Sequence, residues 1–310
     1  MPERIRAFAP ATVANVGCGF DSLGFAVEGL GDEVTAVRRS QAGVSIGDIE
    51  STVDLPMSSD SNIIGIVAKS VLKRASAKFG VELFLKKGLG VGTGLGSSAA
   101  SAAAAGYAVN ELLDTPLSQK ELLDAILDGE EAVSGRHADN AAPALLGGLV
   151  LITGQELSGL RVLPVPDGLQ VVLVSPDFRL DTRKARSVLP SEVRLGEALK
   201  QSRNLAALVD ACHRNDALDF LSAARDELIE AYRLPLIPGA LEATQRCREL
   251  GYVATFLSGS GPTIAVLCLD SANIDEIRLA IEGAFSGSGL TSFCHVSSVG
   301  AAGARRLEPT

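Results

Sequence analysis

The segment Gly88-Leu89-Gly90-Val91-Gly92-Thr93-Gly94-Leu95-Gly96-Ser97-Ser98 alternates glycine with other residues and ends in two serines. The surrounding pattern predicts a strand before it, over residues 81–85, and an alanine-rich helix over residues 97–113. Glycine lets a backbone approach a phosphate closely, and a helix N-terminus offers free N–H groups and the positive end of its dipole to an anion. The segment therefore predicts a loop that holds the phosphates of a nucleotide.

Two common nucleotide-binding motifs are excluded for this loop. A Walker A loop would end in Gly-Lys followed by Ser or Thr, and this segment has no lysine. A dinucleotide fingerprint would place an acidic residue at a strand end about 20 residues later, whereas Asp114 follows a predicted helix. A simple turn with a serine N-cap gives the same pattern, so the interpretation depends on other segments.

Charge and cysteine content narrow the class of protein. The 310 residues carry a net charge of −9 without a long basic run, which argues against nucleic acid or an anionic membrane as a partner. The five cysteines are widely spaced, so we expect free thiols rather than a disulfide framework or a zinc site. We find neither a targeting segment nor an apolar stretch of membrane-spanning length, and we expect a cytoplasmic protein.

Predicted strands and helices are mixed in both halves without a regular βαβ rhythm, which indicates an α+β fold. We expect two domains, residues 1–156 and 157–310. Ser118-x-x-Glu121 predicts a capping box that opens a helix, and we expect the small, polar tail, residues 301–310, to be frayed. Further expected strands cover residues 5–9, 33–38, 44–46, 53–55, 147–153, 160–166, 169–175, 252–257, 263–268 and 292–298, and further helices cover residues 63–79, 118–132, 199–214, 217–229, 239–250 and 274–285.

Several polar side chains are candidates for chemistry. Asn15 and Asp21, in a glycine-rich segment after the first strand, suit a hydroxyl or an ammonium group, although both residue types also hold turns. Glu130 can offer a hard oxygen to Mg²⁺, and His137 and Asn140 are spaced so that they could face one site. A solvated helix end and a loop histidine would explain these last residues as well. His213 and His295 fall in helix and strand patterns, where we expect structural roles.

Two arginines and a second glycine turn complete the candidates. The planar guanidinium groups of Arg186 and Arg233 match a carboxylate or a phosphate, but isolated arginines are usually surface residues. The segment Ser258-Gly259-Ser260-Gly261-Pro262-Thr263 lies between two predicted strands. It has the composition of a hairpin turn, and its glycines and serines also suit an anion-binding nest.

Three glycine-bearing segments in this order, residues 10–24, 88–101 and 258–263, resemble the GHMP kinase family. Within the family the likeness is greatest to the branch that phosphorylates L-homoserine. It is closest in residues 9–15 and 19–24, close in residues 94–101 and 137–148, and also present in Thr182-x-x-Ala185-Arg186 and Leu189-Pro190. It covers nearly the whole chain. The resemblance implies an N-terminal domain like ribosomal protein S5 domain 2 and a ferredoxin-like C-terminal domain. It also implies ATP-dependent phosphorylation of the L-homoserine hydroxyl, with Mg²⁺, in threonine synthesis.

For the nucleotide, the resemblance implies that the glycine loop holds the triphosphate and that Asn62 lies near the base. Ser98 and Glu130 would bind Mg²⁺. The implied ATP-binding residues are Asn62, Gly88, Leu89, Gly90, Val91, Gly92, Thr93, Gly94, Leu95, Gly96, Ser97 and Ser98.

For the second substrate, the resemblance implies that Asp21 binds the ammonium group of homoserine and that Arg186 and Arg233 bind its carboxylate. Asn140 would meet the reacting hydroxyl, and Asn15 would assist catalysis. An asparagine cannot act as a carboxylate base, so we expect no dedicated protein base, with the proton passing to phosphate or water. The implied substrate-binding residues are Asn15, Asp21, His137, Asn140, Thr182, Arg186, Arg233 and Gly259.

The chain departs from the family pattern at Cys18, where Pro is common, and at Gly90 and Thr93, where Pro and Arg are common. The absence of an arginine at position 93 removes one possible phosphate contact. It puts the affinity for the nucleotide in doubt more than the type of reaction. Two alternatives stay open: another kinase of the family, acting on mevalonate, shikimate or a sugar, and a catalytically silent ATP-binding regulator. A homodimer is one assembly that the sequence allows.

Overall fold

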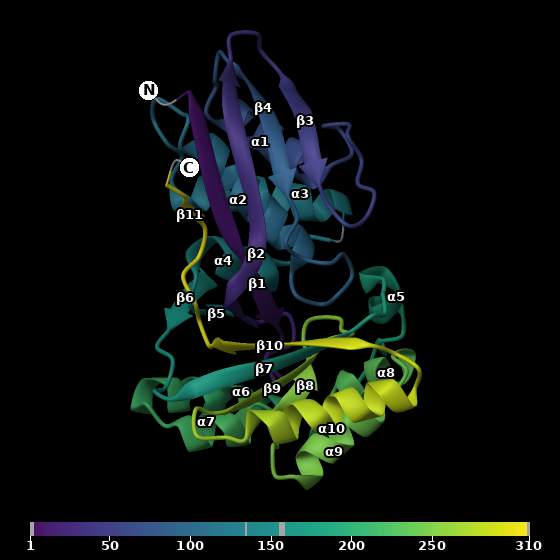
Figure 1. Cartoon of the computed structure of the whole chain (residues 1–310). Helices are drawn as coiled ribbons and strands as arrows, with labels where there is room; N and C mark the ends of the chain where they lie inside the picture. The colour runs from purple at the N-terminus through teal and green to yellow at the C-terminus, as the bar shows by residue number, and fades with distance from the viewer. Residues whose placement is uncertain (1–2, 134, 155–158, 309–310) are drawn as a thin grey trace.

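Two β-sheets frame the computed structural model, which describes residues 3–133, 135–154 and 159–308 (Figure 1). Among these residues, the first sheet has the order β11-β1-β2-β4-β3, with β5 paired to β2 and β6 to β5, and the second has the order β10-β7-β9-β8. The strands are β1 (Arg4–Ala14), β2 (Leu23–Arg39), β3 (Val44–Glu50), β4 (Gly80–Lys86), β5 (Leu149–Ile152), β6 (Leu160–Leu163), β7 (Leu169–Pro176), β8 (Thr255–Leu257), β9 (Ile264–Leu269), β10 (Ser292–Ser298) and β11 (Arg305–Arg306).

An alanine-rich helix, α2, packs against β1 and β2 and against its neighbours α1, α3 and α4. Nearly every residue from Ala99 onward in α2 is buried, and a helix that is apolar all round is a core helix. Its short side chains let the surrounding elements approach closely. The helices are α1 (Ile63–Arg74), α2 (Ser97–Asn110), α3 (Gln119–Val133), α4 (Ala138–Leu146), α5 (Thr182–Ser187), α6 (Leu195–Arg214), α7 (Ala217–Ala223), α8 (Glu230–Arg233), the 3₁₀ turn η2 (Leu234–Leu236), α9 (Ala240–Glu249) and α10 (Ile274–Gly287).

The second sheet is buried on both faces, as the alternation along β7 shows. Val172 and Val174 share a core cluster with α9 and α10, which cover one face (Figure 1). Val171 and Leu173 point the other way, into a cluster that contains α6, α7 and Phe25 of β2. Successive side chains of a strand face opposite sides, so β7 joins both cores and packs the two sheets against each other.

Some of the predicted helices and strands have different bounds in the structure, and one predicted strand is absent from the described residues. The helix predicted over residues 63–79 ends at Arg74, and the one over residues 217–229 ends at Ala223. Residues 53–55 form no strand. The first strand was predicted to end before Pro10, but β1 continues through this residue. A shift in the register with β2 between Pro10 and Thr12 accommodates the proline. The capping box is confirmed, since the N–H of Ser118 donates to Glu121 Oε2 at 3.0 Å and the N–H of Glu121 donates to Ser118 Oγ at 3.4 Å.

The prediction of a frayed tail is also wrong over residues 301–307. These residues form backbone hydrogen bonds with the first sheet and its neighbours. The N–H of Ala301 donates to Ala26 O and the N–H of Leu307 to Arg6 O, at 3.0 and 2.8 Å. Strand β6 likewise pairs with the first sheet from beyond residue 156. The domain division at residue 156 lies outside the described residues and stays a prediction. Over the described residues, no helix is long and apolar enough to cross a membrane.

Candidate active site

One cavity of about 610 Å³ brings together most of the predicted site residues. They come from both units of the fold, where the first unit contains the first sheet and the second unit contains the second sheet. The loop residues that line it are Val91, Gly92, Thr93, Gly94, Gly96, Ser97 and Ser98; the others are Asn15, Asp21, Asn62, Glu130, His137, Asn140, Thr182, Arg186, Arg233 and Gly259. Gly88, Leu89, Gly90 and Leu95 do not line it. Leu89 and Leu95 are buried in the core instead.

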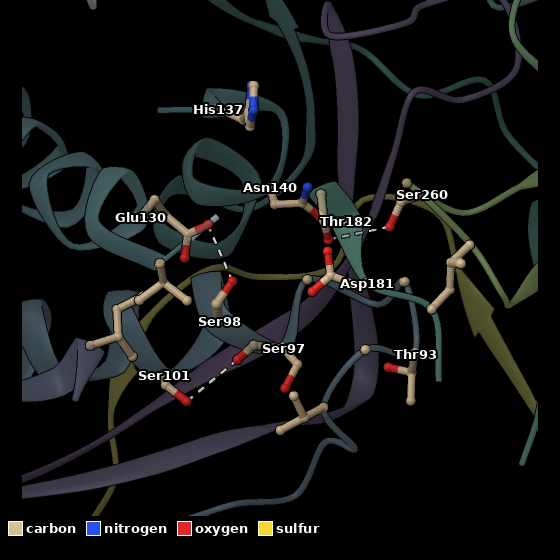
Figure 2. Close-up of a pocket in the computed structure, with 18 of the residues that line it drawn as sticks. Thr93, Ser97, Ser98, Ser101, Glu130, His137, Asn140, Asp181, Thr182 and Ser260 are labelled. Atoms are coloured by element: carbon tan, nitrogen blue, oxygen red, sulfur yellow. Dashed lines mark hydrogen bonds between the residues drawn. The ribbon is translucent and has the colours of Figure 1, made fainter. Parts of the chain in front are cut away.

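The end of the glycine loop is pressed against β1 and α4. Gly96 is the N-cap of α2, with a φ of +63°, and a Cβ there would lie 1.9 Å from Thr12 Oγ1. Only glycine fits such a position. The first turn of α2 contains no acidic residue, and Ser97 and Ser98 face the cavity from it (Figure 2). The positive end of the helix dipole is therefore directed at the cavity, as anion binding requires.

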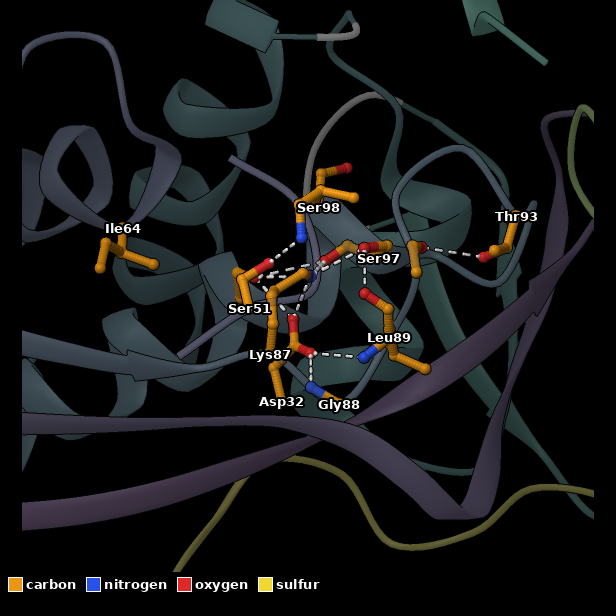
Figure 3. A network of polar contacts seen from close by, with 12 residues as sticks. Asp32, Ser51, Ile64, Lys87, Gly88, Leu89, Thr93, Ser97 and Ser98 are labelled. Carbon is orange, nitrogen blue, oxygen red and sulfur yellow. Dashed lines mark hydrogen bonds and ion pairs between the residues drawn. The ribbon is translucent and has the colours of Figure 1, made fainter. Parts of the chain in front are cut away.

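A buried ion pair anchors both ends of the loop, and sequence reasoning missed it. Lys87 Nζ pairs with Asp32 Oδ2 and also donates to Ser97 Oγ and Ser101 Oγ, at 2.7 and 3.0 Å (Figure 3). The other oxygen, Asp32 Oδ1, accepts from the N–H groups of Gly88 and Leu89. The side chain of Asp32 is 0% exposed and that of Lys87 is 5% exposed. The amides of residues 88 and 89 are thus committed to Asp32 and not to the cavity.

The two loop positions where the chain departs from its family touch each other. Thr93 Oγ1 donates to Gly90 O at 3.1 Å, and a Cβ on Gly90 would lie 2.9 Å from Thr93 Cγ2. The threonine side chain therefore occupies the space beside Gly90 and closes a short turn within the loop.

Ser98 and Glu130 offer two oxygens at the place where Mg²⁺ was predicted. Ser98 Oγ donates to Glu130 Oε2 at 3.2 Å, and both residues line the cavity beside the start of α2 (Figure 2). Mg²⁺ prefers one or two carboxylates and completes its octahedron with water and substrate phosphates. This donor set fits Mg²⁺.

The opposite end of the cavity carries the charges that match an amino acid. Arg186 and Asp21 form a two-pronged ion pair, with Nη2 2.7 Å from Oδ1 and Nη1 3.1 Å from Oδ2. Arg233 is almost fully buried, and its guanidinium donates to Gly259 O and Ala185 O, at 3.1 and 3.2 Å. Both guanidiniums lie over the ring of Phe20, at 5.4 and 5.2 Å from its centroid.

The carbonyl of Gly259 joins the two units at this end. Asn15 Nδ2 donates to it at 2.7 Å, beside the bond from Arg233. Asn15 Oδ1 in turn accepts from the N–H of Asp21. Asn15 and Asp21 both have a positive φ, at +73° and +54°, which short polar side chains tolerate better than others. The side chain of Asn15 therefore fixes the backbone that presents Asp21.

Asn140 is held with a defined orientation in the middle of the cavity. Its Oδ1 accepts from Thr12 Oγ1 at 2.8 Å, and its Nδ2 group, which has two N–H donors, makes a long contact of 3.5 Å with Asp139 Oδ1. Burial and the nearby Asp21 raise the pKa of the adjacent Asp139 to about 7. Burial, followed by the positive charge of Arg186, lowers the pKa of His137. His137 is therefore neutral at physiological pH.

Four hydrogen bonds among the described residues hold the glycine loop to the second unit, one of them from the N–H of Thr263 to Thr93 O at 3.3 Å. Ser258 Oγ donates to Gly94 O and Thr263 Oγ1 to Thr93 O, both at 2.6 Å. The N–H of Leu180 donates to Gly92 O at 3.4 Å. The loop's shape thus depends on the hairpin at residues 258–263 as well as on its own glycines.

Several residues that line the cavity were not predicted, namely Phe20, Lys87, Ser101, Asp139, Arg179, Asp181 and Arg183. Asp139 belongs to the motif that carried the resemblance, so its position was a usable signal. Asp32 and Lys87 are 55 residues apart, and no local pattern connects them.

Comparisons with known proteins show the family of this chain. The model of the GHMP kinases N terminal domain matches residues 62–148, and the model of the GHMP kinases C terminal region matches residues 195–287. The chain belongs to the GHMP kinase family. Its two-domain α+β fold and its kinase class, both expected from the sequence, are thereby confirmed.

This GHMP kinase is similar to proteins named homoserine kinase. The one from Xanthomonas campestris is 40% identical over 97% of this chain and 94% of its own length. The one from Arabidopsis thaliana is 42% identical over 97% of this chain and 84% of its own length. The crystal structure of homoserine kinase from Cytophaga hutchinsonii superposes with a TM-score of 0.92 at 36% identity, covering 99% of this chain and 98% of the other.

Proposed function

We propose that this GHMP kinase transfers the γ-phosphoryl group of ATP to the hydroxyl of L-homoserine, giving O-phospho-L-homoserine for threonine synthesis. The observation that carries the proposal is the single cavity that joins an anion-binding helix N-terminus to Asp21, Arg186 and Arg233. The high identity to named homoserine kinases over nearly the whole chain supports it. An uncharged sugar offers no charge to these three groups, whereas a zwitterion matches both signs.

In this proposal the substrate lies with its charged end toward the second unit. Asp21 binds the ammonium group, and the fork-shaped guanidiniums of Arg186 and Arg233 bind the carboxylate. Gly259, Thr182 and neutral His137 complete the wall. A neutral imidazole at position 137 adds no positive charge beside the ammonium group. The hydroxyl then points toward Asn140 and the start of α2.

Asn140 is the residue that we assign to the reacting hydroxyl. Thr12 fixes the amide so that Nδ2–H donates to the hydroxyl oxygen, which orients that oxygen toward the γ-phosphate. Asn15 positions Asp21 and Gly259, and therefore the rest of the substrate. Phosphoryl transfer depends mainly on positioning and charge neutralisation, so we assign the hydroxyl proton to phosphate or water rather than to a protein base.

Ser98 and Glu130 would hold Mg²⁺, which supplies charge neutralisation to the phosphates when bound. The cavity-facing loop residues, 91–94 and 96–98, would hold the triphosphate through N–H groups. Asn62 lines the same cavity, and its side chain caps α1 by accepting from the N–H of Ile64 at 3.1 Å. We place the adenine base beside it. A cytoplasmic location and a homodimer remain part of the proposal.

The test is ADP release from ATP and Mg²⁺ with a panel of acceptors: L-homoserine, mevalonate, shikimate and galactose. Turnover that is fastest by far with L-homoserine supports the proposed function. A preference for another acceptor would move the protein to another branch of the family. ATP binding without turnover on any acceptor would point to a regulator and contradict the proposal.

A further inference from the structure

Arg179 is a cation on the wall of the cavity that the proposed function leaves without a role. It belongs to the second unit, three residues beyond the end of β7 at Pro176, yet it lines the same cavity as Gly92 and Thr93 of the glycine loop. The loop itself, residues 88–98, contains neither lysine nor arginine. A positive side chain at this place therefore has to come from another part of the chain.

The side chain of Arg179 lies directly over the loop. A Cβ built on Gly92 would be 2.7 Å from Cγ of Arg179 and 3.4 Å from its Nε. The backbone beside it is fixed, because the N–H of Leu180 donates to Gly92 O and the Leu180 side chain is buried in the core of the second unit. The stem of the arginine thus lies against the loop, although the residue as a whole is exposed.

The other cations around the cavity already have partners inside the protein. Over the residues that the structure describes, Arg179 forms no ion pair and no side-chain hydrogen bond. The engaged cations are Lys87 with Asp32, Arg186 with Asp21, Arg233 with Ala185 O and Gly259 O, and Arg183 with Val133 O.

Building on the proposed function, we propose that Arg179 binds the polyphosphate chain of ATP and presses it from the second unit against the glycine loop. An arginine fork donates two parallel hydrogen bonds to a phosphate. A charge-assisted bond of this kind contributes about 1.5–3 kcal/mol, or roughly 10–100-fold in affinity. The position of the stem against the loop reduces the entropy that is lost when the guanidinium engages.

The decisive experiment measures calorimetric binding of AMP, ADP and ATP, with Mg²⁺, to the full-length protein and its variants. Arg179→Gln keeps much of the stem and removes the charge, Arg179→Lys keeps the charge, and Arg203→Gln is a control at an exposed arginine on α6. We expect Arg179→Gln to weaken ADP or ATP binding roughly 10–100-fold and to leave AMP binding unchanged. Arg179→Lys should recover part of the loss, and Arg203→Gln should behave as the wild type.

Steady-state kinetics add a second readout. Arg179→Gln should raise KM for ATP without raising KM for L-homoserine. The inference would be overturned if Arg179→Gln bound each of the three nucleotides with the affinity of the wild type. It would also be overturned if the variant lost affinity for AMP and ATP by the same factor, because such a loss indicates a distorted site. Failure of the wild-type protein to bind ATP would instead contradict the proposed function, so the two failures are distinguishable.

Discussion

Asp21 and Arg186 bind each other at one end of the cavity, with three N–O contacts between 2.7 and 3.1 Å. In the proposed function the same two groups bind the opposite charges of one zwitterion. Substrate binding then exchanges an internal ion pair for two contacts with the substrate, so part of the gross binding energy offsets the loss of that pair. The exchange favours ligands that carry both charges, because a ligand with only one would leave its partner group unpaired.

Arg186→Gln should raise KM for L-homoserine roughly 10–100-fold, since it removes charge-assisted hydrogen bonds to the carboxylate, and should leave KM for ATP near the wild-type value. Lys184→Gln is the matched control, an exposed cation on the same helix. The combined Asp21→Asn and Arg186→Gln variant should deviate from additivity, because the two side chains contact each other. Unchanged KM for homoserine in Arg186→Gln would remove this residue from the substrate site.

Glu130→Gln should raise the Mg²⁺ concentration needed for half-maximal activity several-fold, because a neutral amide is a weaker ligand for a hard cation than a carboxylate. Ser98→Ala should act in the same direction. The neighbouring Glu131→Gln, with a side chain that is 64% exposed, serves as the control. Titration of activity with Mg²⁺ at fixed ATP provides the measurement, and identical curves for Glu130→Gln and Glu131→Gln would refute the metal assignment.

Lys87→Met should destabilise the fold by about 3–5 kcal/mol, because it leaves the buried Asp32 carboxylate without its charge partner. Lys69→Met breaks an ion pair at the surface, with Asp60 87% exposed, and should cost about 0–1 kcal/mol. Urea unfolding measures both changes. The double variant Asp32→Asn with Lys87→Met should recover part of the stability but not the affinity for ATP, since the loop amides lose their carboxylate acceptor. A double variant with wild-type KM for ATP would argue against an anchoring role.

Asp139→Asn should change how stability depends on pH. Burial raises the pKa of Asp139 to about 7, against about 3.9 for an unperturbed aspartate. Between about pH 4 and pH 7 the folded protein therefore retains a proton that the unfolded chain releases, and folding becomes less favourable as pH rises. The variant lacks this penalty, so its stability relative to wild type should increase from pH 5 to pH 8.

Thermal melts across this pH range, with Asp177→Asn as an exposed control, provide the measurement. A constant difference between Asp139→Asn and wild type would show that Asp139 does not titrate in this window.

The sequence predicted elements whose pattern is local and missed those that depend on distant partners. The strand over residues 292–298 was predicted with the observed bounds. Helix α4 was missed because it is short and contains Pro143, a residue that usually ends a helix. The tail was misjudged because its order comes from backbone hydrogen bonds to Ala26 and Arg6, which composition does not encode.

The candidate site was also predicted where its residues belong to local motifs and missed where they depend on distant partners. Residues in recognisable motifs, such as Ser98, Asn140 and Arg186, were named in advance and line one cavity. Asp32 was not, because a single aspartate in a strand has no signature until Lys87 and the loop amides are brought to it. Arg179 was passed over for the opposite reason, since an exposed arginine next to Leu180 looks like ordinary surface.

The hairpin at residues 258–263 has a consequence for how the binding of one ligand affects the binding of the other. Ser258 and Thr263 hold the carbonyls of the glycine loop, while Gly259 holds Asn15 and Arg233. One short segment therefore supports both substrate positions, and a shift caused by either ligand reaches the other. Such coupling is reciprocal: if ATP tightens the affinity for the amino acid by some factor, the amino acid must tighten the affinity for ATP by the same factor.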